Sequence, residues 1–300
     1  MNEGAPPGKI GAYLSLAAAM GIAGSSVVTA KVLACRFPVF LAGGCSLGAA
    51  SIALLPAAWR GRGNLRLRRR DVAVIALQAL TGIFLFRVLL MYGLRRASAV
   101  EAGLMTSSLP AVTALIAFAA RLEKPTPAKA AGILLSAAGL AVTQIPGASP
   151  AAGGGNIPAI ILVFAAVICE AVFTVLQKKI PPAVPPLAST ALVCIWGCGW
   201  FLPLAACEAF HFAGPAGPAD VLFLAYYGLV VTALAFFLFY QGARRVPAST
   251  AGAFKGLMPL SGLILSHFVL GEAILLRHAA SLALVLAGIA VMERAGARSG

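Results

Sequence analysis

Long apolar runs separated by short polar connections dominate this sequence. Each run extends over roughly 20 residues, the length that an α-helix needs to cross the hydrocarbon core of a bilayer. The pattern predicts ten membrane-spanning helices, at residues 10–31, 37–59, 72–94, 98–119, 129–146, 157–177, 187–206, 219–241, 248–270 and 275–293. The connections between them carry proline, glycine or charge, which are typical of turns. The sequence therefore predicts an all-α integral membrane protein with ten transmembrane helices.

Composition supports the membrane class. The 300 residues are 60% hydrophobic and 11% charged, and their mean hydropathy is +0.94. Soluble domains contain about 45–50% apolar and about 25% charged residues. A soluble fold of this size could not bury so much apolar surface, so the bilayer is the expected surrounding.

The net charge of +14 would suggest a nucleic-acid partner in a soluble protein. Here most of the 23 basic residues lie in short connections, including the cluster at 60–70. Cytoplasmic loops of membrane proteins carry an excess of lysine and arginine. The distribution predicts a multi-pass protein of the plasma (inner) membrane with both termini in the cytoplasm, and no nucleic-acid partner.

An internal repeat relates the two halves of the chain at a constant offset of 149 residues. The matched positions include Asp71 with Asp220, Arg95-Arg96 with Arg244-Arg245, Pro110 with Pro259, and Glu123 with Glu272. Equivalent helices lie five spans apart, an odd number, so the two copies would cross the membrane in opposite directions. Inverted repeats with a solute site near the midplane between them are typical of many secondary transporters.

The repeat also predicts the domain boundaries. Residues 1–146 would form the N-terminal repeat with helices 1–5, and residues 157–300 would form the C-terminal repeat with helices 6–10. Residues 147–156 are rich in glycine, alanine and proline and would form the linker.

Short motifs around the repeat resemble the EamA type of the drug/metabolite transporter superfamily. The motifs are Arg95-Arg96-Ala97-Ser98-Ala99 with Pro110 and Leu122-Glu123, and Pro247-Ala248-Ser249-Thr250-Ala251 with Pro259 and Leu270-Gly271-Glu272. The resemblance covers nearly the whole chain and implies a ten-helix bundle of inverted repeats that exports or takes up metabolites. It leaves the substrate open.

Two positions depart from the pattern of that family. The fourth predicted helix ends in Arg121-Leu122-Glu123, without the glycine that stands at Gly271. The third predicted helix carries Arg87, where relatives often have an uncharged polar residue. We therefore expect the solute or the gate of this member to differ.

Four ionisable residues fall inside predicted spans, where a charge usually marks a functional site. At roughly 1.5 Å per residue, Arg87 and Glu101 lie about 7 and 10 Å outward of the midplane. Glu170 and Lys255 lie about 5 and 6 Å inward. The depths suggest two couples of opposite sign.

Two interpretations of these couples remain open. They could be static ion pairs, or they could line the solute path as ligands or gates. In the second case Arg87 or Lys255 would hold a carboxylate, and Glu170 or Glu101 would hold an amine or a transported proton. Glu101 could also lie near enough to the surface to be solvated.

Proline and small residues suggest mechanical roles. Pro110 and Pro259 lie near the middle of predicted spans, where a missing backbone donor could form a hinge beside the cavity or a simple kink. Small residues spaced seven apart recur in helices five and ten, at Gly132, Gly139, Ser281 and Gly288. Small residues allow close helix packing, so these helices would join the halves or form a homodimer contact.

The functional prediction is a secondary transporter that exports a small amphipathic or zwitterionic metabolite, with amino acids favoured. Exchange or a coupling proton would supply the energy, because the phosphate-binding loop of ATPases is absent from the sequence. No catalytic constellation, metal-ligand spacing or cofactor motif stands out. The alternatives are an exporter of cationic drugs that relies on Glu170 or Glu101, and a lipid-carrier flippase.

Overall fold

The computed structural model describes residues 7–60, 68–106, 108–120, 127–143, 156–177, 179–180, 184–212, 214, 217–243, 254 and 257–298. Within these ranges all regular structure is helical. The first half contains α1 (Pro7–Arg36), α2 (Val39–Arg60), α3 (Arg69–Gln78), η2 (Ala79–Leu85), α4 (Phe86–Leu94), α5 (Ala99–Thr106), α6 (Leu109–Ala119) and α7 (Pro127–Thr143). The second half contains α8 (Ile157–Gln177), α9 (Pro186–His211), α10 (Pro218–Ala225), η3 (Tyr226–Leu234), α11 (Ala235–Ala243), α13 (Leu257–Leu270) and α14 (Leu276–Arg298).

Several of these helices are long and apolar enough to cross a membrane. The described residues contain six such spans: Ile10–Arg36, Val39–Pro56, Arg69–Leu94, Ile157–Gln177, Leu187–His211 and Pro218–Gly242. The helices α5 and α6 are bent by 41° relative to each other at a short break. If they form one broken span, the number of spans is seven. Shorter apolar helices occur in α7, α13 and α14. The chain is thus a multi-pass membrane protein, and the count of ten spans stays a prediction.

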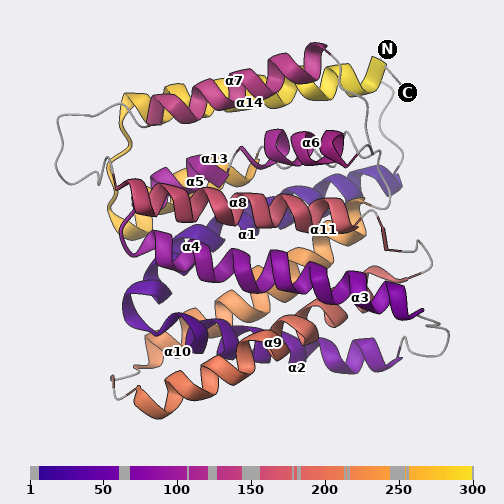
Figure 1. Ribbon diagram of the computed structural model, residues 1–300, viewed down its shortest axis with the longest axis vertical. Coiled ribbons are helices and arrows are strands. Elements are labelled where there is room, and N and C mark those ends of the chain that lie inside the picture. Colours follow the sequence, from indigo (N-terminus) through magenta and orange to yellow (C-terminus); the bar gives the residue numbers. More distant parts are fainter. Residues whose placement is uncertain are drawn as a thin grey trace.

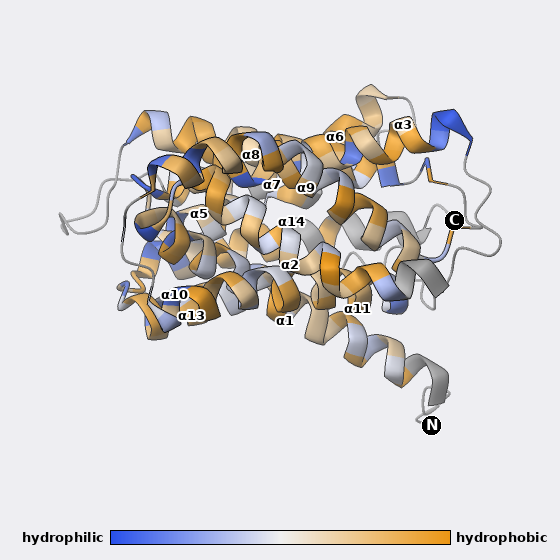
Figure 2. Cartoon of the chain, turned by 90° about the horizontal axis from the view of Figure 1, so that it is seen from below, coloured by the Kyte–Doolittle hydropathy of each residue, from blue (hydrophilic) through white to orange (hydrophobic). Residues whose placement is uncertain are grey.

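The helices lie side by side along one common direction (Figure 1). The start of α1 and the end of α14 lie at the same end of the molecule, called here the N/C end (Figures 1 and 2). The turns at 37–38, 95–98 and 271–275 lie at the other end, called here the far end (Figure 1). Hydrophobic residues predominate along the helices, as expected of segments that cross a bilayer (Figure 2).

The packing of the two halves is reciprocal. Helix α1 packs against α11 and α13, and its equivalent α8 packs against their equivalents, α4 and α6. Helices α2 and α9 pack on each other, and so do α7 and α14, which form a layer on one side of the bundle (Figure 1). The sequence repeat therefore corresponds to a repeat of helix contacts.

Local geometry repeats as well. The third helix of each half is interrupted by a π-helical segment, and the segments η2 and η3 end at Leu85 and Leu234, 149 residues apart. Each of these long helices also begins with a carboxylate cap. Asp71 accepts a hydrogen bond from the N–H of Arg68 at 3.0 Å, and Asp220 accepts one from the N–H of Gly217 at 3.0 Å.

Small residues bring α7 and α14 into close contact. A Cβ atom at Gly139 would lie 2.8 Å from Cγ2 of Val285 and 2.9 Å from the carbonyl oxygen of Ser281. Ser281 is fully buried, and Gly132 and Gly288 are also buried. The four small residues singled out in the sequence thus lie in the interior, and Gly139 faces α14 directly.

Candidate solute cavity

A cavity of about 140 Å³ lies between the two halves, surrounded by α1, η2, α4, the α5–α6 break, α8, η3, α11 and α13. An apolar cavity of roughly 150 Å³ in another protein holds benzene. The space therefore suits one small organic molecule.

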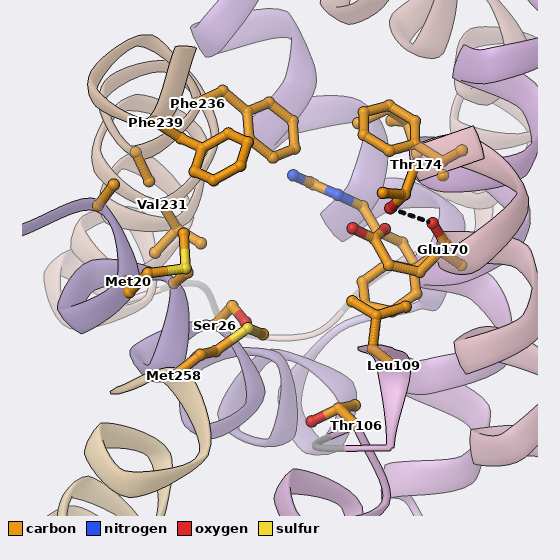
Figure 3. Close-up of a pocket in the computed structure, with 18 of the residues that line it drawn as sticks. Met20, Ser26, Thr106, Leu109, Glu170, Thr174, Val231, Phe236, Phe239 and Met258 are labelled. Carbon is orange, nitrogen blue, oxygen red and sulfur yellow. Dashed lines mark hydrogen bonds between the residues drawn. The ribbon is translucent and has the colours of Figure 1, made fainter. Parts of the chain in front are cut away.

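The walls of the cavity differ in chemistry. Figure 3 shows Met20, Met258, Phe236 and Phe239 on one side, while Glu170 and Thr174 of α8 lie on the facing side. The Phe236 ring stacks with that of Phe173, another lining residue, at a centroid distance of 6.1 Å. An amphipathic solute could place its apolar part and its polar part against different walls.

Arg87 contributes a positive charge to the cavity lining and is only 5% exposed. Its Nη1 donates to Ser46 Oγ at 3.0 Å, and its Nη2 donates to Thr232 Oγ1. The guanidinium also lies 4.4 Å from the centroid of the Tyr227 ring, a cation–π contact. These partners are neutral, so the charge of Arg87 is solvated by dipoles and an aromatic face but is not neutralised by a carboxylate of the described residues.

Glu101 lies elsewhere. It occupies the first turn of α5, where its Oε2 accepts a 3.4 Å hydrogen bond from the N–H of Ser98, and it does not line the cavity. The ion pair found among the described residues joins Arg36 to Asp220. The Arg87–Glu101 couple expected from their depths is therefore not formed. Similar depth does not fix the direction in which a side chain leaves its helix, and Arg87 turns toward α2 and η3.

The other two predicted charges have different outcomes. Glu170 lines the cavity, and the hydroxyl of Thr174 donates to its backbone carbonyl at 2.9 Å (Figure 3). Lys255 lies outside the described residues. The cavity thus brings together Arg87 and Glu170, which the sequence had assigned to separate couples.

Both predicted hinge prolines lie near the start of a described helix. Pro110 is the second residue of α6, directly after the break that bends the α5–α6 pair, and Pro259 is the third residue of α13 and lines the cavity. A proline in a first helical turn removes no intrahelical hydrogen bond. The α5–α6 pair bends by 41° at the break before Pro110, so the chain changes direction at that proline. The hinge role of Pro110 and Pro259 stays a prediction.

An apolar cluster separates the cavity from the far end. Beyond Arg87, the next two turns of α4 contribute Leu90, Met91 and Leu94, all fully buried. They pack with Val27 and Leu33 of α1 in the largest described cluster. In the other direction, the lining residues continue to the ends of α8 and α11 at the N/C end. The cavity therefore extends toward the N/C end.

Two charged side chains also connect helices at the far end by hydrogen bonds to backbone groups. Lys31 Nζ donates to the carbonyl oxygens of Leu94 at 2.5 Å and Ala97 at 2.6 Å. The carboxylate of Glu272 accepts the backbone N–H groups of Ala99 at 2.9 Å and Val100 at 2.8 Å. Glu272 thereby links the turn before α14 to the start of α5, which belongs to the other half.

Ser46 and Thr232 were not predicted from the sequence, and Tyr227 was not distinguished from the other aromatic residues. The partners of Arg87 could have been sought in the sequence, because a buried arginine requires hydrogen-bond acceptors. Hydroxyl residues in the neighbouring apolar spans were the available neutral acceptors.

Comparison with known proteins gives concordant matches. The EamA-like transporter family matches residues 9–144 and again residues 157–294. The "Uncharacterized transporter YetK" of Bacillus subtilis (strain 168) is 38% identical over 291 residues, covering 94% of this chain and 87% of that protein.

Two further matches are more distant. A Streptantibioticus cattleyicolor protein named "Probable terminal-alkyne amino-acid exporter" is 29% identical over 259 residues, covering 82% of this chain and 84% of that protein. A crystal structure matches with a TM-score of 0.67 at 21% identity, covering 97% of this chain and 99% of the other. That likeness shows a shared fold.

Proposed function

Because the chain belongs to the EamA-like transporter family, we propose that it is a secondary active transporter that exports a small metabolite by alternating access. An amino acid or a similar zwitterion is the favoured solute. The observation that carries this choice is Arg87, a buried guanidinium in the cavity wall whose described partners are neutral.

A solute carboxylate would complete the environment of Arg87. Arginine binds carboxylates through paired, charge-assisted hydrogen bonds, which gain strength where water is scarce. Glu170 lines the same cavity and would receive the solute amine or a coupling proton. A relative named as an amino-acid exporter agrees with this choice.

The proposed transport cycle rests on ten spans arranged as two inverted repeats. The bent α5–α6 pair and the shorter helices α7, α13 and α14 would supply the spans beyond the six long ones. With both termini in the cytoplasm, the cavity extends toward the cytoplasm and the apolar cluster closes the outer side. Exchange of solutes or movement of a coupling proton would drive the change to the opposite arrangement, in which the cavity opens to the outer side.

Glu170 supports a second candidate function, the export of an organic cation. A carboxylate in an apolar cavity would attract such a solute, whereas Arg87 would repel it. Neutralising Arg87 therefore separates the candidates, because cation binding would persist or improve and zwitterion binding would be lost.

The test is a thermal-shift screen of the purified protein against amino acids, nucleosides and organic cations, since a bound solute raises the unfolding temperature by mass action. We expect amino acids to stabilise the wild type and to lose this effect in Arg87→Gln. Arg36→Gln is the control, because Arg36 pairs with Asp220 at a 56% exposed position away from the cavity. Stabilisation by cations that survives in Arg87→Gln would refute the proposal.

A further inference from the structure

We propose that Ser46, Gly228 and Thr232 are positioning residues that hold the Arg87 guanidinium as a preorganised anion-binding group. The π-helical segment η3 provides two of them. This inference rests on the proposed function, because it concerns the same cavity and the carboxylate of its solute.

The winding of η3 differs from that of an α-helix. In an α-helix a threonine hydroxyl bonds to the carbonyl three or four residues back. The hydroxyl of Thr232 instead donates to the carbonyl of Tyr227, five residues back, at 2.8 Å. This is the spacing of a π-helix, which commonly marks functional sites.

The hydroxyl groups of Thr232 and Ser46 each have a defined donor and acceptor role. A hydroxyl has one hydrogen to donate, and its oxygen can also accept. Because Thr232 donates within η3, it can only accept from Nη2 of Arg87. Ser46 repeats the arrangement on α2: its hydroxyl donates to the carbonyl of Gly43 at 3.0 Å and accepts from Nη1 of Arg87.

The segment η3 approaches α2 closely at Gly228. A Cβ atom at Gly228 would collide with the backbone carbonyl of Ser46, so only glycine permits this packing. Both hydroxyls are deeply buried, with Ser46 at 0% and Thr232 at 1% exposure. Gly228 therefore sets the spacing at which one guanidinium reaches acceptors on both halves of the chain.

The consequence is a guanidinium that is fixed before the solute arrives. Two acceptors and the Tyr227 face define the plane of Arg87, and a guanidinium carries five N–H donors. The two hydroxyls use two of these donors, and the others can meet a carboxylate. Preorganisation of this kind strengthens binding because less side-chain freedom is lost.

The test compares L-leucine with L-leucinamide, which lacks the carboxylate, by calorimetric binding to the purified protein. The readout is the ratio of the two dissociation constants. Thr232→Val keeps the shape of the side chain but removes the acceptor, and Thr232→Ser keeps the hydroxyl. We expect Thr232→Val to reduce the preference for leucine about tenfold, the effect of losing one hydrogen bond to a charged group. We expect Thr232→Ser to retain the wild-type preference.

Ser46→Ala should reduce the preference in the same direction as Thr232→Val. Equal weakening of both ligands in these variants, or no change, would overturn the positioning role. Arg87→Gln separates this outcome from failure of the proposed function. If Arg87→Gln removes the preference for leucine and Thr232→Val does not, the positioning role alone is wrong. If the wild type shows no preference, or Arg87→Gln retains it, both proposals fail.

Discussion

Neutralising Glu272 should loosen the far end of the protein. Its two carboxylate oxygens accept hydrogen bonds from the backbone N–H groups of Ala99 and Val100 at 2.9 and 2.8 Å. These N–H groups stand at the start of α5, where the helix itself provides no acceptor. In Glu272→Gln one oxygen remains as an acceptor, while the amide nitrogen cannot accept. One N–H then loses its partner, and the favourable charge at the helix N-terminus is lost.

The magnitude follows from these two losses. A hydrogen bond to a charged group contributes about 1.5–3 kcal/mol, and a charge at a helix N-terminus contributes about 0.3–1 kcal/mol. We expect Glu272→Gln to lower the free energy of unfolding by about 2–3 kcal/mol. The measurement is thermal or denaturant unfolding of the purified protein in detergent, followed by circular dichroism.

Glu208→Gln provides the matched control. Glu208 Oε2 accepts one backbone N–H, that of Leu41, at 2.8 Å. A glutamine can keep this single bond by turning its carbonyl oxygen toward Leu41, so the loss should be clearly smaller. Equal destabilisation by the two variants would refute the reasoning, because it would show that the paired acceptance by Glu272 is irrelevant.

The remaining predictions concern packing, surface charge and topology. Gly139→Ala should lower the free energy of unfolding by about 1–3 kcal/mol, because its Cβ would press on the α14 backbone. Gly103→Ala has open space around its Cβ, so in the same unfolding assay it should be neutral or stabilising. Arg36→Gln should leave the unfolding temperature unchanged, because the Arg36 side chain is 56% exposed and exposed ion pairs contribute little to stability. A marked fall in the unfolding temperature would contradict this. Cysteines introduced at Asn64 and Ala151 should react with an impermeant maleimide from opposite sides of the membrane, and labelling from one side would refute the inverted repeat.

Hydropathy predicted the helices and the membrane class because burial in lipid acts on whole segments. It did not predict the break between α5 and α6, since the residues on both sides of that break are predominantly apolar. The π-helical segments were equally invisible. Their residues are apolar, like those of an ordinary transmembrane helix, so hydropathy does not distinguish the two windings.

The sequence was informative about which charges to examine and poor at pairing them. Arg87 and Glu170 were both singled out, and both line the cavity. Depth along a span gave the level of each charge but not its rotation about the helix axis. The neutral partners of Arg87 come from helices 41 and 145 residues away in sequence, so only the packed structure could identify them.

The repeat of the backbone is not matched by a repeat of chemistry. At the offset that aligns η2 with η3, the position of Arg87 corresponds to Phe236 on the apolar wall. If the halves exchange roles, a guanidinium and a phenyl ring exchange surroundings, and the electrostatic potential at the solute cannot be the same in both arrangements. The affinity for the solute would then differ between the two openings. Such an asymmetry lets a carrier load at one face and release at the other, while the driving gradient still determines the direction of net flux.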